Sequence, residues 1–468
     1  MHSFRRESSD VLLRDADTLE VVTASDVDAL AAEIRETDAG LCFLFADSSL
    51  QSITRFLAVL EAGVPVLLLD PDLAAAPIER LLSTYSPDLV FCPSSESPVL
   101  DLLGEGTRDG RGRWRSAGAG VPTCHPDLAV LLSTSGSTGS PKLVRLSRAN
   151  VLSNARAIAD SLALQPDDRA VTSLPMFYSF GMSLVTSHVE AGSSVVVTSR
   201  SVIDRNFWQM IDDHRVTHLA GVPATYAMLK RLRFFDRDLP HLRALLQAGG
   251  RLDTGLVEEF ARDSLARGRR FYVMYGQTEA SPRMSCLPAD RVLDKIGSVG
   301  PALAGGHFEI HDEDGAVLPV GEVGEVVYSG PNVMLGYAQC RDDLSRGDDA
   351  AGVLRTGDLG YLDEEEFLHL TGRIKRIAKI SGARVSLDDL ERMLAALSPV
   401  AVVAAPEDGV VVFTAHPDAA AVAAGRKDLA RSLGAPPTLL RFQQVVDLPT
   451  LPNGKIDYQR LTAQAAAL

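Results

Sequence analysis

Five consecutive segments decide the expected fold: LCFLF (41–45), LQSITRFLAVLEAG (50–63), VPVLLL (64–69), AAPIERLLSTY (75–85) and LVFCP (89–93). Three are short apolar runs, and two are helical patterns that lie between them. Apolar runs separated by helices of about 10 to 15 residues are typical of βαβ units. The segments therefore predict a parallel sheet that is covered on both faces.

The same alternation continues along the chain. Further strands are predicted at AVLLST (129–134), SVVVTS (194–199), VTHLAG (216–221) and FYVMYG (271–276). Helices are predicted to begin near Ala149, Ile203, Ala224 and Thr254. The first 300 residues are thus expected to form a large body of parallel α/β sheets.

The sequence pattern changes after about Ile296. HFEIHDEDGAVLPVGEVGEVVYSG (307–330) has a DG turn between apolar runs, which predicts an antiparallel sheet or small barrel. Beyond the basic connector GRIKRIAK (372–379), a helix at 386–397, a hairpin at 400–415 and a helix at 419–433 are expected. The predicted fold class is therefore α/β, with a small β-barrel-like part and a small α+β C-terminal domain.

Composition excludes several classes of function. The chain has 468 residues, and 46 Lys and Arg against 61 Asp and Glu give a net charge of −15. Such a chain without a basic run is a poor binder of nucleic acid or anionic membranes. The polar start MHSFRRESSD and the lack of a long apolar run favour a cytoplasmic protein without a membrane span. Five scattered cysteines without a CxxC pair are expected to be reduced thiols that bind no metal.

The segment STSGSTGSPK (133–142) directly follows an apolar strand. Its glycines allow the backbone to approach a ligand, successive N–H groups form an anion cradle, and Lys142 adds positive charge. These features suit a polyphosphate, and the alternative is a flexible Ser/Gly loop. The segment is not a Walker A loop, because Gly136 and Gly139 are too close together and no GK[ST] follows.

Three more motifs accompany this segment: YGQTEAS (275–281), RTGDLGYL (355–362) and LPTLPNGKIDYQRL (448–461). Together and in this order, the four motifs resemble the adenylate-forming superfamily of acyl-CoA synthetases, luciferase-like enzymes and peptide-synthetase adenylation domains. The resemblance covers nearly the whole chain. It implies an AMP-forming acid–thiol ligase that uses ATP and Mg²⁺.

The resemblance also implies site residues. Lys455, Thr278 and Glu279 would be catalytic, with Glu279 also holding Mg²⁺. The ATP site would comprise Thr134, Ser135, Gly136, Ser137, Thr138, Gly139, Lys142, Gly249, Gly250, Arg251, Tyr275, Gly276, Gln277, Thr278, Asp358, Arg373 and Lys455. Within it, the loop and Lys142 would grip the β- and γ-phosphates, Tyr275 would stack on adenine, and Asp358 and Arg373 would bind the ribose.

Each role has a structural alternative. Glu279 could be an ordinary acid in the first turn of a helix, favoured by the helix dipole. Asp358 could cap a turn, Lys455 could be a solvated surface lysine, and Tyr275 could be a core aromatic. The chemistry nevertheless needs such groups, because a carboxylate that attacks a phosphate requires cations where negative charge builds up.

The connector has an implied role in mechanism. Residues 1–372 would form the large domain, 373–376 a hinge centred on Lys375, and 377–468 a small mobile domain that carries Lys455. Rotation of the small domain would present a second face for thioester formation. Lys379, Gly382 and Arg384 would meet the pantetheine arm of the thiol, and the alternative is a solvated basic loop.

The acid pocket implied by the resemblance is mostly apolar. Its residues are Tyr178, Ser179, Phe180, Gly181, Gly221, Val222, Pro223, Tyr226, Met274, Ser281 and Arg283. Residues 177–186 contain no acid that could pair with an ammonium group, so an α-amino acid is disfavoured. A fatty, short-chain or aryl acid suits such a pocket. Three residues depart from the family pattern: Leu143, Arg148 and Tyr178. These departures weaken the inference of any one substrate class from the family.

The predicted function is therefore ATP-dependent formation of an acyl-AMP and pyrophosphate, followed by transfer to the thiol of CoA or of a carrier-protein pantetheine. A weaker resemblance points to ligases of specialised metabolism. The alternatives are transfer to an amine or another nucleophile, an ATP phosphotransferase, and a degenerate nucleotide-binding protein. No nucleic-acid or membrane partner is expected.

Overall fold

The computed structural model describes residues 10–116, 124–133, 142–380, 383–397, 399–406, 408–416, 418–433, 435–451 and 456–466. Contacts divide the chain into two compact units. Unit 1 comprises residues 1–307 and 328–354, and unit 2 comprises residues 308–327 and 355–468. The predicted boundary at the 373–376 hinge stays a prediction.

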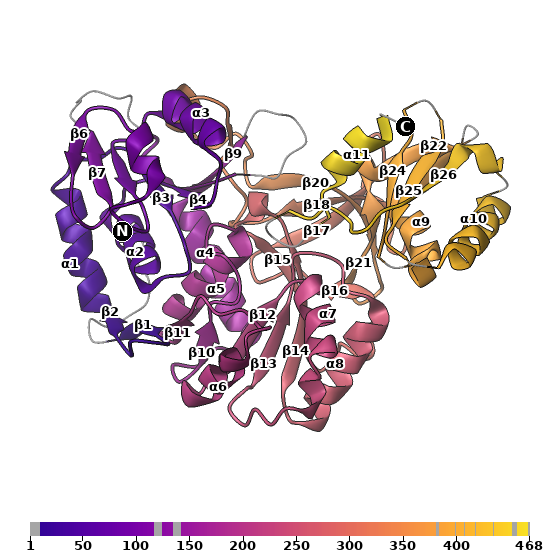
Figure 1. The fold of residues 1–468 in the computed structure, drawn as a ribbon, viewed down its shortest axis with the longest axis horizontal. Helices are drawn as coiled ribbons and strands as arrows, with labels where there is room; N and C mark the ends of the chain where they lie inside the picture. The colour runs from indigo at the N-terminus through magenta and orange to yellow at the C-terminus, as the bar shows by residue number, and fades with distance from the viewer. Residues whose placement is uncertain are drawn as a thin grey trace. The chain divides into compact units, whose positions relative to one another are not determined.

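In the described part of unit 1, one eight-stranded sheet has the order β15-β14-β13-β12-β10-β11-β1-β2 (Figure 1). Its strands are β1 (Val11–Asp15), β2 (Val21–Thr23), β10 (Arg169–Val171), β11 (Ser194–Val197), β12 (His218–Gly221), β13 (Ala244–Gln247), β14 (Arg270–Gly276) and β15 (Arg283–Leu287). The six central strands pair in parallel, and β2 and β15 are antiparallel edges. The predicted parallel sheet is confirmed.

A second eight-stranded sheet, again counted over the described residues, has the order β19-β9-β8-β4-β3-β5-β7-β6. Its strands are β3 (Cys42–Phe45), β4 (Val66–Leu69), β5 (Leu89–Phe91), β6 (Gly106–Arg108), β7 (Arg113–Ser116), β8 (Leu128–Ser133), β9 (Leu143–Ser147) and β19 (Gly336–Ala338). The strands β8, β4, β3 and β5 pair in parallel. They are the strands at residues 41–45, 64–69, 89–93 and 129–134 of the sequence prediction.

Helices cover both faces of these sheets. They are α1 (Ala24–Arg35), α2 (Leu50–Ala62), α3 (Ala75–Tyr85), α4 (Arg148–Leu162), α5 (Ser179–Glu190), α6 (Arg205–Asp213), α7 (Pro223–Arg231) and α8 (Thr254–Ala266). Alternate residues of β3 enter different cores, because strand side chains alternate between faces. Cys42 and Leu44 join the core that α1, α2, α4 and α5 share with both sheets, while Phe43 and Phe45 join the core under α3.

Unit 2 begins with the predicted Gly-punctuated sheet. Its strands β17 (His307–His311), β18 (Gly324–Ser329), β20 (Val353–Leu362) and β21 (Leu368–Arg373) are neighbours in the order β21-β20-β18-β17. The strands β20 and β21 are antiparallel. The DG turn is confirmed, since the Gly315 N–H donates to the Asp312 carbonyl and His311 bridges Val317. The short strand β16 (Ser298–Gly300) belongs to unit 1.

The last 90 residues form the predicted α+β arrangement. The elements are β22 (Ile377–Ile380), β23 (Ala383–Ser386), α9 (Leu387–Met393), β24 (Val400–Ala404), β25 (Val410–Thr414), α10 (Ala419–Leu433), β26 (Leu440–Gln444) and α11 (Tyr458–Ala466). The sheet β24-β25-β26 packs against α9 and α10 on one face and α11 on the other. The helix predicted at 386–397 is shorter, and a 3₁₀ turn over Ala395–Leu397 completes it, since Pro399 disfavours further helix.

Candidate active site

The Ser/Thr/Gly stretch joins two paired strands. Ser133 at the end of β8 lies opposite Leu143 at the start of β9, and the predicted phosphate-binding residues from Thr134 to Gly139 lie outside the described residues. Lys142 enters β9 with its Nζ 5.0 Å from the centre of the Tyr337 ring. Leu143, which departs from the family pattern, is fully buried in the core.

Glu279 lies beside the same tyrosine. It is partly buried in a 3₁₀ turn, Thr278–Ala280, that follows β14. The Tyr337 hydroxyl donates a hydrogen bond of 2.9 Å to Glu279 Oε1, and burial followed by the Glu279 charge raises the pKa of this phenol. Tyr337 thus brings the predicted phosphate lysine and the predicted Mg²⁺ ligand to one ring. Sequence reasoning missed Tyr337, because no motif marks it.

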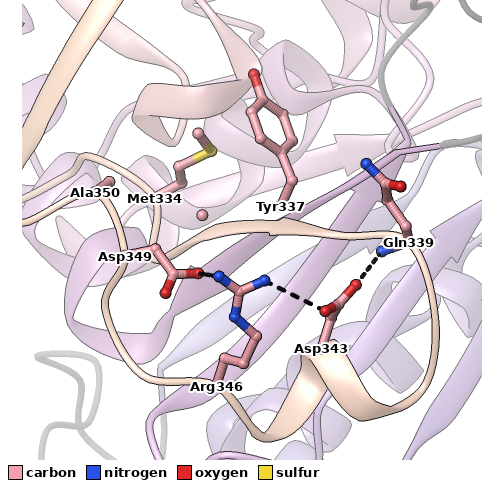
Figure 2. A pocket seen from close by; sticks show the side chains of 8 residues that line it. Met334, Tyr337, Gln339, Asp343, Arg346, Asp349 and Ala350 are labelled. Carbon is pink, nitrogen blue, oxygen red and sulfur yellow. Dashed lines mark hydrogen bonds and ion pairs between the residues drawn. The ribbon is translucent and has the colours of Figure 1, made fainter.

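A pocket of about 460 Å³ extends from Tyr337. It is lined by Met334, Gly336, Tyr337, Gln339, Asp343, Arg346, Asp349 and Ala350 (Figure 2). Figure 2 shows the Arg346 guanidinium between two carboxylates, with distances of 3.3 Å to Asp343 and 3.1 Å to Asp349. Arg346, a cation that lines the pocket, is therefore already paired with two carboxylates of the protein.

Arg145 fixes the segment that carries Tyr337. It is fully buried in β9, and its guanidinium donates to the carbonyls of Leu335, Tyr337, Arg346 and Gly347 and to the Asp349 carboxylate. These bonds span about 190 to 204 residues of sequence. The signal that sequence reasoning overlooked is a charged residue in the middle of the apolar strand LVRLS.

The predicted adenine segment follows β13. Gly249 has φ +85°, and a Cβ there would lie 3.0 Å from Val222 Cγ1, so this position favours glycine. Gln247 Nε2 donates to the Gly250 carbonyl at 2.8 Å, which fixes the turn before the exposed Arg251. Gly276, at the end of β14, also excludes a side chain, because a Cβ would lie 1.8 Å from the Pro282 carbonyl oxygen.

Several predicted pocket residues do lie together. The Ser179 and Thr278 hydroxyls are 3.2 Å apart, which joins the first turn of α5 to the YGQTE motif. A Cβ on Gly249 would lie within 4.0 Å of both Val222 and Phe180. The Arg283 guanidinium carbon is 4.5 Å from the centre of the Phe180 ring. These contacts form one cluster within unit 1.

Other predicted pocket residues are packed or bonded elsewhere. Tyr226 is buried against Phe260 and Phe271, and a Cβ on Gly221 would meet its ring at 3.1 Å. The Ser281 hydroxyl donates to the Asn332 carbonyl at 2.8 Å.

The remaining members of this set occupy varied positions. Tyr178 is the N-cap residue of α5, and burial raises the pKa of its phenol to about 12. Gly181 packs against Pro175, where a Cβ would lie 2.2 Å from the carbonyl oxygen. Met274 and Tyr275 are buried in β14, with Gln277 partly buried after it. The roles assigned to all of these residues stay predictions.

One of the departures from the family pattern has a structural explanation. The guanidinium of Arg148, at the start of α4, donates to the Leu60 carbonyl and to Glu61 Oε2, the latter at 2.9 Å. It ties α4 to the end of α2, where an arginine can reach both groups.

The predicted ribose-binding pair lies in unit 2. Asp358 in β20 is directly opposite Arg373 in β21, and Arg373 Nε is 2.7 Å from Asp358 Oδ1. The Asp358 side chain is 5% exposed and that of Arg373 58%. A buried carboxylate with an exposed guanidinium is an arrangement that can accept one hydroxyl and donate to another.

The predicted connector has a partly buried cation, Arg376. Arg376 Nε lies 2.6 Å from Asp388 and its Nη2 lies 2.8 Å from Glu391, and its guanidinium carbon is 3.8 Å from the centre of the Tyr458 ring. Sequence reasoning did not single out Arg376, since its partners come from α9 and α11. It anchors the chain at the last residue of the predicted hinge, 373–376.

The other connector residues are described unevenly. Lys375 lies in a 3₁₀ turn and Arg384 in β23, and the structure describes only their backbone. Lys379 in β22 is exposed. Gly382 and Lys455 lie outside the described residues.

The described residues fit a Mg²⁺ that is bound mainly through phosphates. No group of three His, Cys, Asp or Glu side chains in the described ranges is arranged to hold a metal. Mg²⁺ is usually bound by one or two carboxylates together with substrate phosphates, and Glu279, the predicted ligand, would supply one such carboxylate. Within the same ranges, no helix combines the length and apolarity needed to cross a membrane.

Comparison with known proteins gives a consistent set of matches. The family model described as AMP-binding enzyme matches residues 24–338. The 2-succinylbenzoate–CoA ligase of Bacillus cytotoxicus is 33% identical over 274 residues, 57% of this chain and 54% of that protein. A feruloyl-CoA synthase of Amycolatopsis is 30% identical over 72% of this chain and 64% of that protein. The sulfoacetate–CoA ligase of Cupriavidus necator is 30% identical over 75% of this chain and 70% of that protein.

The chain thus spans 54 to 64% of the length of the first two of these relatives. Solved structures match over almost the whole chain. O-succinylbenzoate CoA synthetase from Bacillus subtilis, in complex with its acyl-adenylate, has a TM-score of 0.77 with 23% identity, and the match covers 97% of this chain and 95% of that one. ATP-bound MatB from Rhodopseudomonas palustris has a TM-score of 0.79 with 23% identity, and the match covers 98% of this chain and 96% of that one. These likenesses establish the fold.

Proposed function

The chain belongs to the family of AMP-binding enzymes, and we propose that it activates a carboxylic acid with ATP and passes the acyl group to a thiol. The observation that carries this proposal is the position of Tyr337. Its ring contacts Lys142 and its hydroxyl binds Glu279. The neighbouring Thr278 contacts Ser179 of the predicted acid pocket. A phosphate lysine, an acidic Mg²⁺ ligand and an apolar pocket are what acid adenylation requires.

In the first half-reaction, the carboxylate of the acid attacks the α-phosphorus of ATP. The bond between that phosphorus and the bridging oxygen breaks, and pyrophosphate leaves. Lys142 would bind the phosphates, and Thr278 would orient the α-phosphate. Glu279 would hold Mg²⁺, which offsets phosphate charge when it is bound. Lys455 would neutralise the charge that builds up as the two anions meet.

In the second half-reaction, a thiolate attacks the acyl carbon and AMP leaves. The relatives are named as CoA ligases or a CoA synthase, which favours CoA over a carrier-protein arm as the acceptor. Lys379, Gly382 and Arg384 would line the thiol face after rotation about Lys375. A cytoplasmic location, where ATP and CoA are available, goes with this proposal.

The test is carboxylate-dependent exchange between ATP and pyrophosphate. Lys455→Ala and Glu279→Gln are each expected to lower the exchange rate by at least about 100-fold, because each removes a charge that acts on the transition state. Lys427→Ala is the matched control, since Lys427 is an exposed lysine of α10 in the same unit, and it should exchange as wild type. Robust exchange in Lys455→Ala would identify the wrong cation.

The nucleotide products separate the competing activities. The proposed reaction releases AMP and pyrophosphate, whereas a phosphotransferase releases ADP. Chromatography of the products, with a panel of fatty, short-chain and aryl acids and with or without CoA, decides between them. Formation of ADP under these conditions would refute the proposal.

A further inference from the structure

Arg283 is a buried cation that lacks an anionic partner. It lies in β15 and is 3% exposed, and among the described residues no carboxylate pairs with it and its Nε has no hydrogen-bond partner. The bonds at this residue involve its main chain. Its N–H donates to Asn154 Oδ1 at 3.1 Å, and its carbonyl accepts from the side-chain amides of Asn154 and Asn332 at 2.7 Å and 2.9 Å.

The guanidinium lies against the predicted acid pocket. Its central carbon is 4.5 Å from the centre of the Phe180 ring, and Phe180 is a partly exposed residue in the first turn of α5. Phe180 also lies within 4.0 Å of a Cβ built on Gly249, whose other neighbour is Val222. Arg283 therefore contacts the pocket through the residue that joins α5 to the Gly249 turn.

This arrangement is costly for the protein alone. Burial disfavours a charge that has no counter-ion, and it lowers the pKa of Arg283 to about 10. The group still carries its proton at neutral pH, and the contact with Phe180 recovers only part of the lost hydration.

Other buried arginines of unit 1 donate side-chain hydrogen bonds to acceptors within the protein. Arg145 pairs with Asp349 and four carbonyls. Arg55 donates to the carbonyls of Cys92 and Arg111. Arg269 donates through Nη2 to the carbonyl of Leu239, although its Nη1 has no partner among the described residues. Each of these arginines thus places at least one side-chain N–H on a protein acceptor, whereas the Nε of Arg283 has no such acceptor among the described residues.

We propose that Arg283 binds a second carboxylate on the acid substrate, so that the enzyme selects dicarboxylic acids over monocarboxylic acids of the same size. The inference rests on the proposed acid activation at this pocket. A planar guanidinium binds a carboxylate through two parallel hydrogen bonds, which provides both charge and orientation. One carboxylate of the substrate reacts with ATP, and the other remains on Arg283 throughout.

The experiment compares matched pairs of acids: terephthalate with 4-methylbenzoate, adipate with hexanoate, and succinate with butyrate. The readout is the ratio of kcat/KM for the diacid to that for the monoacid in ATP–pyrophosphate exchange. Wild type should favour the diacid in at least one pair. In Arg283→Met that ratio should fall on the order of 100-fold, because the second carboxylate would then be buried without a partner. Arg283→Lys should give an intermediate ratio, since it keeps the charge and loses the planar fork.

Arg269→Met is the control variant. Arg269 is also a buried arginine, and it directly precedes β14 at the end of that strand remote from Gly276, so its loss should leave the ratio as in wild type. Arg283→Met should fold, because replacing an unpaired buried charge with an apolar group is often neutral or stabilising, and a thermal melt verifies this. If it does not fold, the wild-type ratio and Arg283→Lys still decide.

Two results would overturn the inference: a wild-type preference for the monoacid in every pair, or ratios for Arg283→Met and wild type within threefold of each other. Calorimetric titration of the same acids, with a non-hydrolysable ATP analogue present, separates this failure from failure of the proposed function. Diacid binding that depends on Arg283 without any exchange supports the inference and refutes acid activation. Equal binding of both acids by wild type and Arg283→Met refutes the inference whatever the activity.

Discussion

Replacing Tyr337 with phenylalanine removes one hydroxyl at the candidate site and leaves the ring beside Lys142 in place. The hydroxyl donates to Glu279 Oε1 at 2.9 Å. A hydrogen bond to a charged group is worth ~1.5 to 3 kcal/mol, and the lower end applies because Tyr337 is only partly buried. A loss of ~1.5 kcal/mol corresponds to about tenfold in an equilibrium constant.

The expected result is a selective change in the requirement for Mg²⁺. In the proposed reaction Glu279 would hold Mg²⁺, and without the hydroxyl its side chain would have to become ordered when the metal binds. The Mg²⁺ concentration that gives half-maximal ATP–pyrophosphate exchange should therefore rise about tenfold. The assay is exchange over a Mg²⁺ titration at saturating ATP and acid, with the circular-dichroism melt recorded for each variant.

Tyr328→Phe is the matched control. The Tyr328 hydroxyl donates at 2.8 Å to Asn332 Oδ1 and is buried, so its removal should lower the free energy of unfolding by about 1 kcal/mol. It should leave the Mg²⁺ requirement unchanged. A Tyr337→Phe variant with the wild-type Mg²⁺ requirement, or a control that shifts it equally, would refute the assigned role of Tyr337.

Three further predictions test other parts of the molecule. Arg145→Met should lower the free energy of unfolding in urea by about 3 to 5 kcal/mol, because it leaves Asp349 and four carbonyls without their donor; a loss below about 1 kcal/mol would contradict this. Burial lowers the pKa of His188 to about 4, so the unfolded chain binds the extra proton and stability falls as the pH drops from about 6.5 to 4, by on the order of 3 kcal/mol in total. His188→Phe should reduce the pH dependence of urea unfolding by about one proton in that window, and an unchanged slope would contradict the buried neutral state. Lys375→Pro should leave adenylate formation intact and suppress thioester formation, as measured by exchange and by acyl-CoA release; equal loss of both half-reactions would argue against rotation about this residue.

Central strands such as β3 and β4 could be predicted from the sequence because both of their faces are buried, whereas the central strands β1, β10 and β13 were not predicted. A strand covered by helices on both sides is a continuous apolar run, as at residues 42–45 and 66–69, where every residue is buried. The edge strand β6 and its neighbour β7 were not predicted. Their sequences, GTR and RWRS, are mostly polar and partly exposed, so they carry no hydrophobic pattern that distinguishes them from a loop.

The candidate site was only partly predictable for a related reason. Motifs identified Lys142 and Glu279, because the residues around them have unusual types in a fixed order. Tyr337 and Arg145 lie in ordinary contexts. Their roles arise when β19 pairs with β9, which places the Tyr337 carbonyl next to a guanidinium 192 residues away in the sequence. Such a contact depends on sheet register and not on local pattern.

Arg283 shows where a sequence cannot reveal chemistry even when it identifies the residue. The resemblance placed Arg283 at the edge of the acid pocket. It could not show that the guanidinium is buried and that no described carboxylate pairs with it. The chain has 61 acidic residues against 46 basic ones. A shortage of acidic residues therefore does not explain why no described carboxylate lies near Arg283. Among the described residues, the Arg283 guanidinium is buried beside Phe180 without a carboxylate, so its charge is left for an anion from outside the chain; under the proposed function, that anion is the acid substrate.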